Sequence, residues 1–89
     1  MRYELFYAER AKRDLSQLDQ VVRRRILKKI DFFITATDPL SYSKPLSGSL
    51  AGLHRWRIGD YRAIFAKQDT GELMLLQIIS VKHRREVYK

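Results

Sequence analysis

Two different spacings of apolar residues divide the chain into a helical first half and a strand-rich second half. Residues 3–7 are aromatic and apolar with one charged interruption, which predicts a short opening strand. The apolar positions that follow recur every three or four residues, which predicts one face of a helix: Ala8, Ala11, Leu15 and Leu18. A second stripe with the same spacing consists of Val22, Ile26, Ile30, Phe33 and Ile34. Asp19 is a suitable N-cap for this second helix and Pro39 ends it.

The second half of the chain has the pattern of an antiparallel meander. Residues 38–52 are rich in Ser, Gly and Pro and predict a loop. Strands are then expected at residues 53–58, 61–67 and 72–82, with turns at Gly59-Asp60 and at residues 68–71. Because the last strand is apolar on both alternating faces, we expect it to be central in the sheet and to lie beside the opening strand.

These elements predict an α+β fold with two layers. A very short connection between the helices favours an antiparallel helical hairpin, which would pack on a small, mainly antiparallel sheet of four strands in the order β-α-α-β-β-β. The length of 89 residues fits one domain spanning residues 1–89.

Composition narrows the function classes. The chain has no cysteine and two histidines, which excludes disulfides, thiolate nucleophiles and cysteine-based metal sites, so we expect no metal and no cofactor. No apolar run is long enough to span a membrane and no secretion signal is visible, so we expect a cytoplasmic protein that does not bind membranes. The formal net charge of +8 attracts polyanions, nucleic acid above all.

The predicted hairpin places three arginines on one face of the sheet. If Gly59 and Asp60 form the turn, Arg57 pairs with Arg62, and strand alternation puts both on the face of Arg55. Trp56 would then lie on the opposite face, in the core. Because like charges directly opposed in a sheet are destabilising, this arrangement indicates an anion-binding face. The alternative is that the arginines are merely solvated, or that a bulge at the turn separates Arg57 from Arg62.

Two further basic segments carry candidate residues. The C-terminal segment ends in His83-Arg84-Arg85-Glu86-Val87-Tyr88-Lys89, where His83 has a pKa range suited to proton transfer and Tyr88 is able to stack on a base. These residues are equally consistent with a frayed basic terminus. The second helix carries Arg24 and Lys28, which are typical of a solvated helix face and, less often, of a track for a nucleic-acid backbone.

The chain resembles the RelE/ParE toxin superfamily of bacterial type II toxin–antitoxin systems, and within it the RelE-like branch. The order of the elements supports this resemblance, together with three sequence signatures: Leu46-x-Gly48-x-Leu50-x-Gly52, Arg55-x-Arg57-Ile58-Gly59-Asp60-Tyr61-Arg62 and His83-Arg84-Arg85-x-Val87-Tyr88. The RelE branch comprises metal-independent endoribonucleases that cut mRNA in the ribosomal decoding site. The resemblance therefore implies a ribosome-dependent mRNA interferase that forms a 2′,3′-cyclic phosphate.

The resemblance also implies roles for individual residues. The expected catalytic residues are Arg57, Arg62, His83, Arg84 and Tyr88, with the choice between His83 and Arg84 open. The residues expected to bind RNA are Arg55, Lys82, Arg85, Lys44, Arg24 and Lys28. The expected partners are an acidic RelB-like antitoxin, the ribosome and mRNA, and the toxin–antitoxin complex is expected to bind operator DNA. Two alternatives remain: a ParE-like poison of DNA gyrase without nuclease activity, and a basic RNA-binding module without catalysis.

Overall fold

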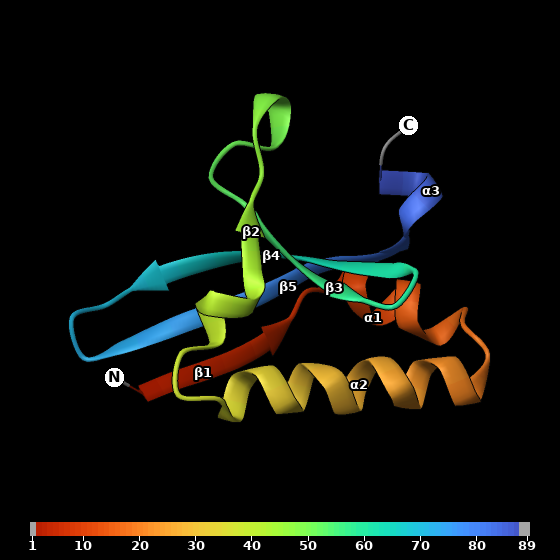
Figure 1. The fold of residues 1–89 in the computed structure, drawn as a ribbon, viewed down its shortest axis with the longest axis horizontal. Helices are drawn as coiled ribbons and strands as arrows, with labels where there is room; N and C mark the ends of the chain where they lie inside the picture. The colour runs from red at the N-terminus through yellow and green to blue at the C-terminus, as the bar shows by residue number, and fades with distance from the viewer. Residues whose placement is uncertain (1, 88–89) are drawn as a thin grey trace.

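A five-stranded mixed sheet with two helices on one face forms the body of the protein (Figure 1). The structure, a computed structural model, describes residues 2–87. Its elements are β1 (Arg2–Tyr7), α1 (Glu9–Ser16), α2 (Gln20–Thr35), the 3₁₀ turn η1 (Pro39–Tyr42), β2 (Ser43–Pro45), the 3₁₀ turn η2 (Gly48–Leu50), β3 (His54–Ile58), β4 (Tyr61–Asp69), β5 (Leu73–His83) and α3 (Arg84–Val87). Among the described residues, no helix is long and apolar enough to cross a membrane.

The strand order is β1-β5-β4-β3-β2. The prediction that the last strand is central and lies beside the opening strand is confirmed, because β5 pairs with β1 in parallel and with β4 antiparallel. The predicted count of four strands is wrong, since β2 adds a fifth at the edge beside β3. This strand is only three residues long and contains Pro45, which lacks a donor for a sheet ladder, so the segment has the composition of a loop.

The helical hairpin packs its apolar stripes against the sheet, as the sequence predicted. Asp19 caps α2, with its carboxylate accepting from the Val21 N–H at 3.0 Å. The buried positions of the two helices are Ala11, Leu15, Ile26, Ile30 and Phe33, and they form one core with residues of β3, β4 and β5. Trp56 is fully buried in this core, as predicted, and its indole Nε1 donates to the Pro39 carbonyl at 3.1 Å. The helices therefore cover one face of the sheet and leave the other, here called the open face, to solvent.

A β-bulge in β5 sets which side chains reach the open face. In the pairing of β4 with β5, Ile64 lies opposite Ser80 and Phe65 lies opposite Ile78, so Ile79 is an extra residue. Before the bulge Leu76 and Ile78 are in the core, and after it Val81 is in the core. The bulge therefore shifts the alternation by one residue and returns Val81 to the core.

Candidate functional site

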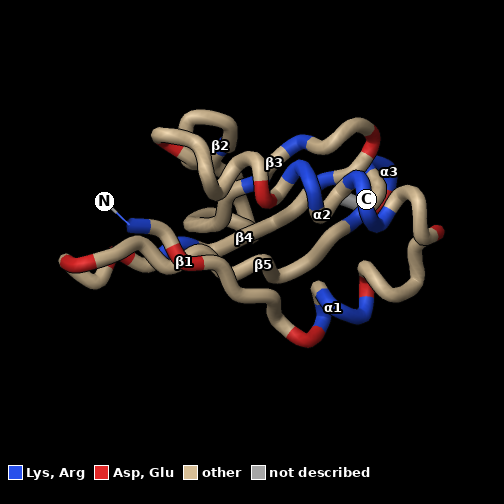
Figure 2. Tube along the Cα trace, turned by 90° about the horizontal axis from the view of Figure 1, so that it is seen from below, with Lys and Arg blue, Asp and Glu red and all other residues tan. Residues whose placement is uncertain are grey.

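Basic side chains of β2, β3, β4 and β5 meet on the open face. The pairing predicted for the hairpin is confirmed: Arg57 lies opposite Arg62, and both alternate with the buried Trp56 and Ile58. On the next strand, Lys82 lies opposite Arg62. These three residues, Arg57, Arg62 and Lys82, form what we call the cationic row, and Figure 2 shows the Lys and Arg segments gathering around α3 at this end of the sheet.

A second pair of basic residues lies beside the cationic row. Lys44 of β2 is opposite Arg55 of β3, and Arg55 is on the same face as Arg57. Lys44 and Arg57 are exposed, whereas Arg55 is half-buried. The structure therefore brings together four of the predicted phosphate- and RNA-binding residues, Lys44, Arg55, Arg57 and Arg62, on one surface.

Arg62 is the central and most unusual member of the row, because its side chain is buried. It is only 5% exposed, and its Nη1 donates to the carbonyls of Gly59 at 3.2 Å and Tyr61 at 3.1 Å. Its Nε is also buried and, within the described residues, has no hydrogen-bond partner. A buried cation without a counter-ion is costly, so this guanidinium would gain from an anion placed on the open face.

Lys82 is the member whose charge is already compensated. Its Nζ lies 3.0 Å from Oδ1 of Asp14 in α1 and 4.0 Å from Oε2 of Glu86 in α3. The other oxygen of Asp14 accepts from the Val81 N–H at 3.0 Å. In this structure Lys82 holds α1 and α3 to the end of β5, and its contact with RNA stays a prediction.

The structure does not bring His83 to the cationic row. His83 lies opposite Tyr61, on the helix-covered face, and their rings make an edge contact with centroids 5.3 Å apart. Its Nδ1 accepts from the Arg85 N–H at 3.3 Å. The ring therefore caps the start of α3 rather than facing Arg57 and Arg62.

The remaining residues of the C-terminal segment lie beside the hairpin turn. The Arg84 N–H donates to the Asp60 carbonyl at 2.7 Å, and the Arg84 guanidinium Nε is 3.9 Å from the Asp60 carboxylate. Arg84 and Arg85 are both exposed. Tyr88, predicted to be catalytic, lies outside the described residues.

The basic residues of α2 form a separate surface. Arg24 and Lys28 are exposed and, with Val21 and Arg25, line a shallow hollow on the outer side of α2. Since α2 covers the face of the sheet opposite to the cationic row, a ligand held by Arg57 and Arg62 does not reach these two residues without wrapping around the domain.

Two of the side chains that the structure describes have shifted pKa values, and both lie away from the cationic row. Burial, with the nearby Lys67 as a second cause, lowers the pKa of His54, which stacks on Phe65 with ring centroids 5.6 Å apart. Burial, assisted by the Asp31 carboxylate, raises the pKa of Tyr7 to about 12. Both groups are therefore neutral near pH 7, and both are part of the packing. Within residues 2–87, no group of three or more His, Cys, Asp or Glu residues has the spacing to hold a metal ion.

Comparison with known proteins identifies the family. Residues 5–88 match the family described as the ParE toxin of the type II toxin–antitoxin system parDE. This chain belongs to the RelE/ParE superfamily of toxins. The toxin is 30% identical to Toxin RelG of Mycobacterium tuberculosis over 89 residues, which is 100% of this chain and 99% of the relative.

Solved structures agree with this assignment. A chain of the toxin–antitoxin complex RelBE2 from M. tuberculosis superposes with a TM-score of 0.77 and 30% identity, covering 94% of the toxin and 100% of that chain. A chain of the archaeal RelE–RelB complex from Pyrococcus horikoshii has the same fold, with a TM-score of 0.67, 24% identity and coverage of 94% and 97%. The toxin therefore shares its fold with chains that were solved in complex with antitoxins.

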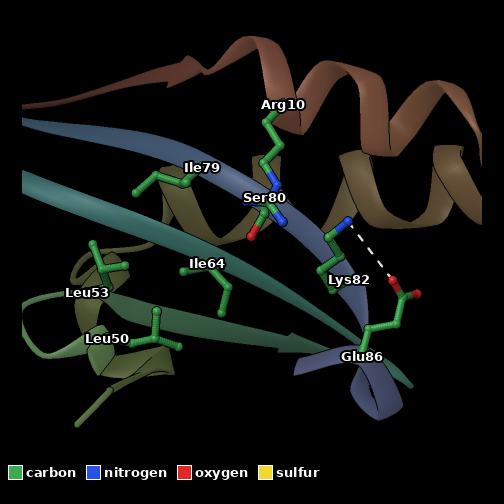
Figure 3. Close-up of a pocket in the computed structure, with 8 residues that line it drawn as sticks. All are labelled: Arg10, Leu50, Leu53, Ile64, Ile79, Ser80, Lys82 and Glu86. Carbon is green, nitrogen blue, oxygen red and sulfur yellow. Dashed lines mark ion pairs between the residues drawn. The ribbon is translucent and has the colours of Figure 1, made fainter. Parts of the chain in front are cut away.

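One basic residue on the open face was missed from the sequence. Arg10 of α1 extends across β5 toward Ser80 (Figure 3). The sequence contained an indication of this position, because Arg10 and Asp14 are four residues apart and so share one side of α1. That side faces the end of β5 because β1, which leads into α1, pairs with β5 and the Ala8 N–H bonds to the Ile78 carbonyl at 2.9 Å.

Proposed function

We propose that this toxin cleaves mRNA on the ribosome, without a metal or cofactor, by attack of a ribose 2′-oxygen on the adjacent phosphorus. The bond from the 2′-oxygen to phosphorus forms and the bond from phosphorus to the 5′-oxygen breaks. The 2′-hydroxyl loses its proton to a base, and the leaving 5′-oxygen gains one. The products are a 2′,3′-cyclic phosphate and a 5′-hydroxyl.

The opposed pair of Arg57 and Arg62 carries this proposal. Arg57 is exposed and lies opposite Arg62, whose charge is buried beneath the open face, so a phosphate there would accept hydrogen bonds from Arg57 and be attracted by the charge of Arg62. Fixed donors aimed at a phosphate whose charge grows in the transition state contribute about 3–4 kcal/mol each. Lys44 and Arg55, on the neighbouring row, are placed to hold the adjoining RNA backbone.

The C-terminal segment is assigned the proton transfer, with His83 and Arg84 as the two candidates. His83 would have to leave both Tyr61 and the Arg85 N–H to reach a phosphate at Arg57 and Arg62. Arg84 is exposed beside the hairpin turn, and its guanidinium is held only by the 3.9 Å contact with the Asp60 carboxylate, as far as the described residues show. Arg85 and Tyr88 complete the proposed RNA contacts at this end, and Arg24 and Lys28 of α2 would contact a different part of the ribosome-bound RNA.

The partner proposed for the toxin is an acidic antitoxin of the RelB kind, which would cover the cationic row and neutralise it. Two of the structural neighbours support this, because their chains come from complexes of RelE-type toxins with their antitoxins. The resulting complex is proposed to bind operator DNA.

Primer extension on a cellular mRNA after induced expression tests the nuclease proposal. Cuts in phase with the codons are expected for wild type. Arg57→Ala removes an exposed side chain and is expected to keep the fold, so a loss of cutting by several hundredfold, on the order of 10²–10³, would report chemistry rather than stability. Arg62→Lys keeps the buried charge and is expected to lose the forked geometry and most of the activity. Arg13→Ala, an exposed arginine of α1, is the matched control for net charge.

A second pair of variants separates the proton-transfer candidates. If His83 transfers the proton, His83→Gln removes most of the cutting and Arg84→Ala retains it; if Arg84 has this role, Arg84→Ala removes most of the cutting and His83→Gln retains it. Undiminished cutting by the Arg57 and Arg62 variants would contradict the assignment of the phosphate site.

A gyrase poison is the second candidate, because the matching family is described as the ParE toxin. DNA-damage signalling without mRNA cuts would establish it. The absence of both cuts and damage signalling, with RNA binding retained, would leave a non-catalytic RNA-binding module.

A further inference from the structure

Next to the cationic row, the open face has a hollow of about 440 Å³ with an apolar floor (Figure 3). The floor consists of Leu50, Leu53, Ile64 and Ile79. The volume is within the range of small-ligand sites, and an apolar floor with a polar rim is their usual composition. The hollow is one step along the sheet from the proposed phosphate site, since Ile64 follows Arg62 by two residues on the same face, a distance of about 7 Å.

The bulge in β5 builds this hollow. In a regular strand the neighbours Ile79 and Ser80 would face opposite sides of the sheet, but both line the hollow. Alternation from the buried Ile78 already places Ile79 on the open face, and the bulge turns Ser80 onto the same face; bulges next to functional sites often re-aim side chains in this way.

The rim of the hollow is charged asymmetrically. On the α3 side, Lys82 and Glu86 are paired with each other at 4.0 Å, and Lys82 is also paired with Asp14 at 3.0 Å. On the α1 side, Arg10 has no ion pair with any described residue. An anion entering the hollow therefore meets a compensated lysine and a carboxylate on one side and a free guanidinium on the other.

We propose that this hollow is a nucleotide subsite, in which the base of the nucleotide next to the scissile phosphate lies on Ile64 and Ile79 and its own phosphate binds Arg10. This inference rests on the proposed function and extends it to a residue of α1. A flat base matches the apolar floor, and a bidentate guanidinium matches a phosphate. About 7 Å along β4, roughly one nucleotide step, separates Arg62 from Ile64 on the floor of the hollow.

NMR titration of the free toxin with a short oligoribonucleotide that carries 2′-deoxy groups, and so resists cutting, tests the subsite independently of catalysis. Saturable shifts are expected at the Ile64 and Ile79 methyl groups of wild type. Arg10→Gln is expected to weaken this binding at least fivefold, Arg10→Lys to restore part of it, and Arg13→Gln, which removes the same charge from the same helix, to leave it unchanged. Equal weakening by the Arg10 and Arg13 variants, or no shifts at the two isoleucines, would overturn the subsite.

Cutting of ribosome-bound mRNA provides the second readout. Arg10→Gln is expected to raise KM and to alter the ranking of sites that differ in the nucleotide next to the cut, while Arg57→Ala lowers kcat. If wild type cuts mRNA and Arg10→Gln cuts with unchanged KM and ranking, the subsite is wrong and the proposed function stands. If wild type cuts no RNA but the methyl shifts depend on Arg10, the nuclease proposal fails and the nucleotide site stands.

Discussion

Replacing Asp14 with alanine is expected to destabilise the toxin by about 2–4 kcal/mol. Its side chain is only 10% exposed and accepts twice: from the Lys82 ammonium at 3.0 Å and from the Val81 N–H at 3.0 Å. Beyond Ile78, the edge of β5 is no longer covered by β1. Asp14 therefore takes the place of a neighbouring strand along the last residues of β5.

The magnitude follows from the two contacts. A hydrogen bond to a charged group contributes about 1.5–3 kcal/mol. Lys82 is 26% exposed, so water solvates its ammonium when Asp14 is removed, and the total cost of Asp14→Ala is smaller than the sum of the two contacts. Asp14→Asn keeps an acceptor for the Val81 N–H and loses only the ion pair, so about 1–2 kcal/mol is expected for it. Urea unfolding followed by the fluorescence of the single tryptophan measures both values.

The control is Glu9→Ala, which removes an exposed acid from the same helix. Glu9 contacts Lys12 at 3.4 Å with its side chain 84% exposed, so a loss below about 1 kcal/mol is expected. A double-mutant cycle of Asp14→Asn with Lys82→Met is expected to give a coupling of about 1–2 kcal/mol. This account of how β5 is held would be refuted if the free energy of unfolding of Asp14→Ala were within about 0.5 kcal/mol of the wild-type value, which is about the usual error of additivity tests.

Three further perturbations test the packing and the hairpin. Trp56→Ala is expected to cost about 3–5 kcal/mol in urea unfolding followed by circular dichroism, because the ring is fully buried against Phe33 and Phe65 and its Nε1 donates to the Pro39 carbonyl; a cost near 1 kcal/mol would contradict its central place. Gly59→Ala is expected to cost about 1–2 kcal/mol, because Gly59 has φ 59°, and Gly59→Asn less, since asparagine tolerates this conformation; equal costs would argue against strain at the turn. Burial lowers the pKa of His54 in the folded state, so protonation of its ring favours unfolding. The contribution of His54 to stability is therefore full above the ordinary pKa of 6.5 and is lost as the pH falls through the lowered pKa. Between pH 8 and pH 5, the free energy of unfolding is expected to fall more steeply for wild type than for His54→Gln, and parallel curves would contradict this.

For the β3–β4 hairpin, the sequence predicted both the two strands and which residues pair across them. A Gly-Asp turn between two alternating runs determines which residues face each other, so the pairing of Arg57 with Arg62 and the burial of Trp56 followed from local rules. The helical hairpin was equally accessible, because Asp19 and the apolar stripe of α2 are local signals.

The features that were missed depend on contacts between distant segments. Strand β2 exists because residues 43–45 reach the free edge of β3, and nothing in their own composition favours a strand. The burial of Arg62 depends on its guanidinium folding back onto the carbonyls of Gly59 and Tyr61. The compensation of Lys82 depends on Asp14, which is 68 residues away in the sequence.

The bulge at Ile79 links the fold to the proposed site. Without the extra residue, the alternation of β5 would carry Ser80 and Lys82 into the core and Val81 out of it, which the cost of burying an unpaired lysine forbids. With it, Lys82 joins Arg57 and Arg62 on the open face, and His83 is turned to the helix-covered face beside Tyr61. The same irregularity therefore assembles the cationic row, opens the hollow beside Arg10 and separates His83 from the phosphate site. For the proposed reaction, we therefore expect the register of β5 to favour Arg84 over His83 in proton transfer, because Arg84 lies just beyond the strand and is exposed.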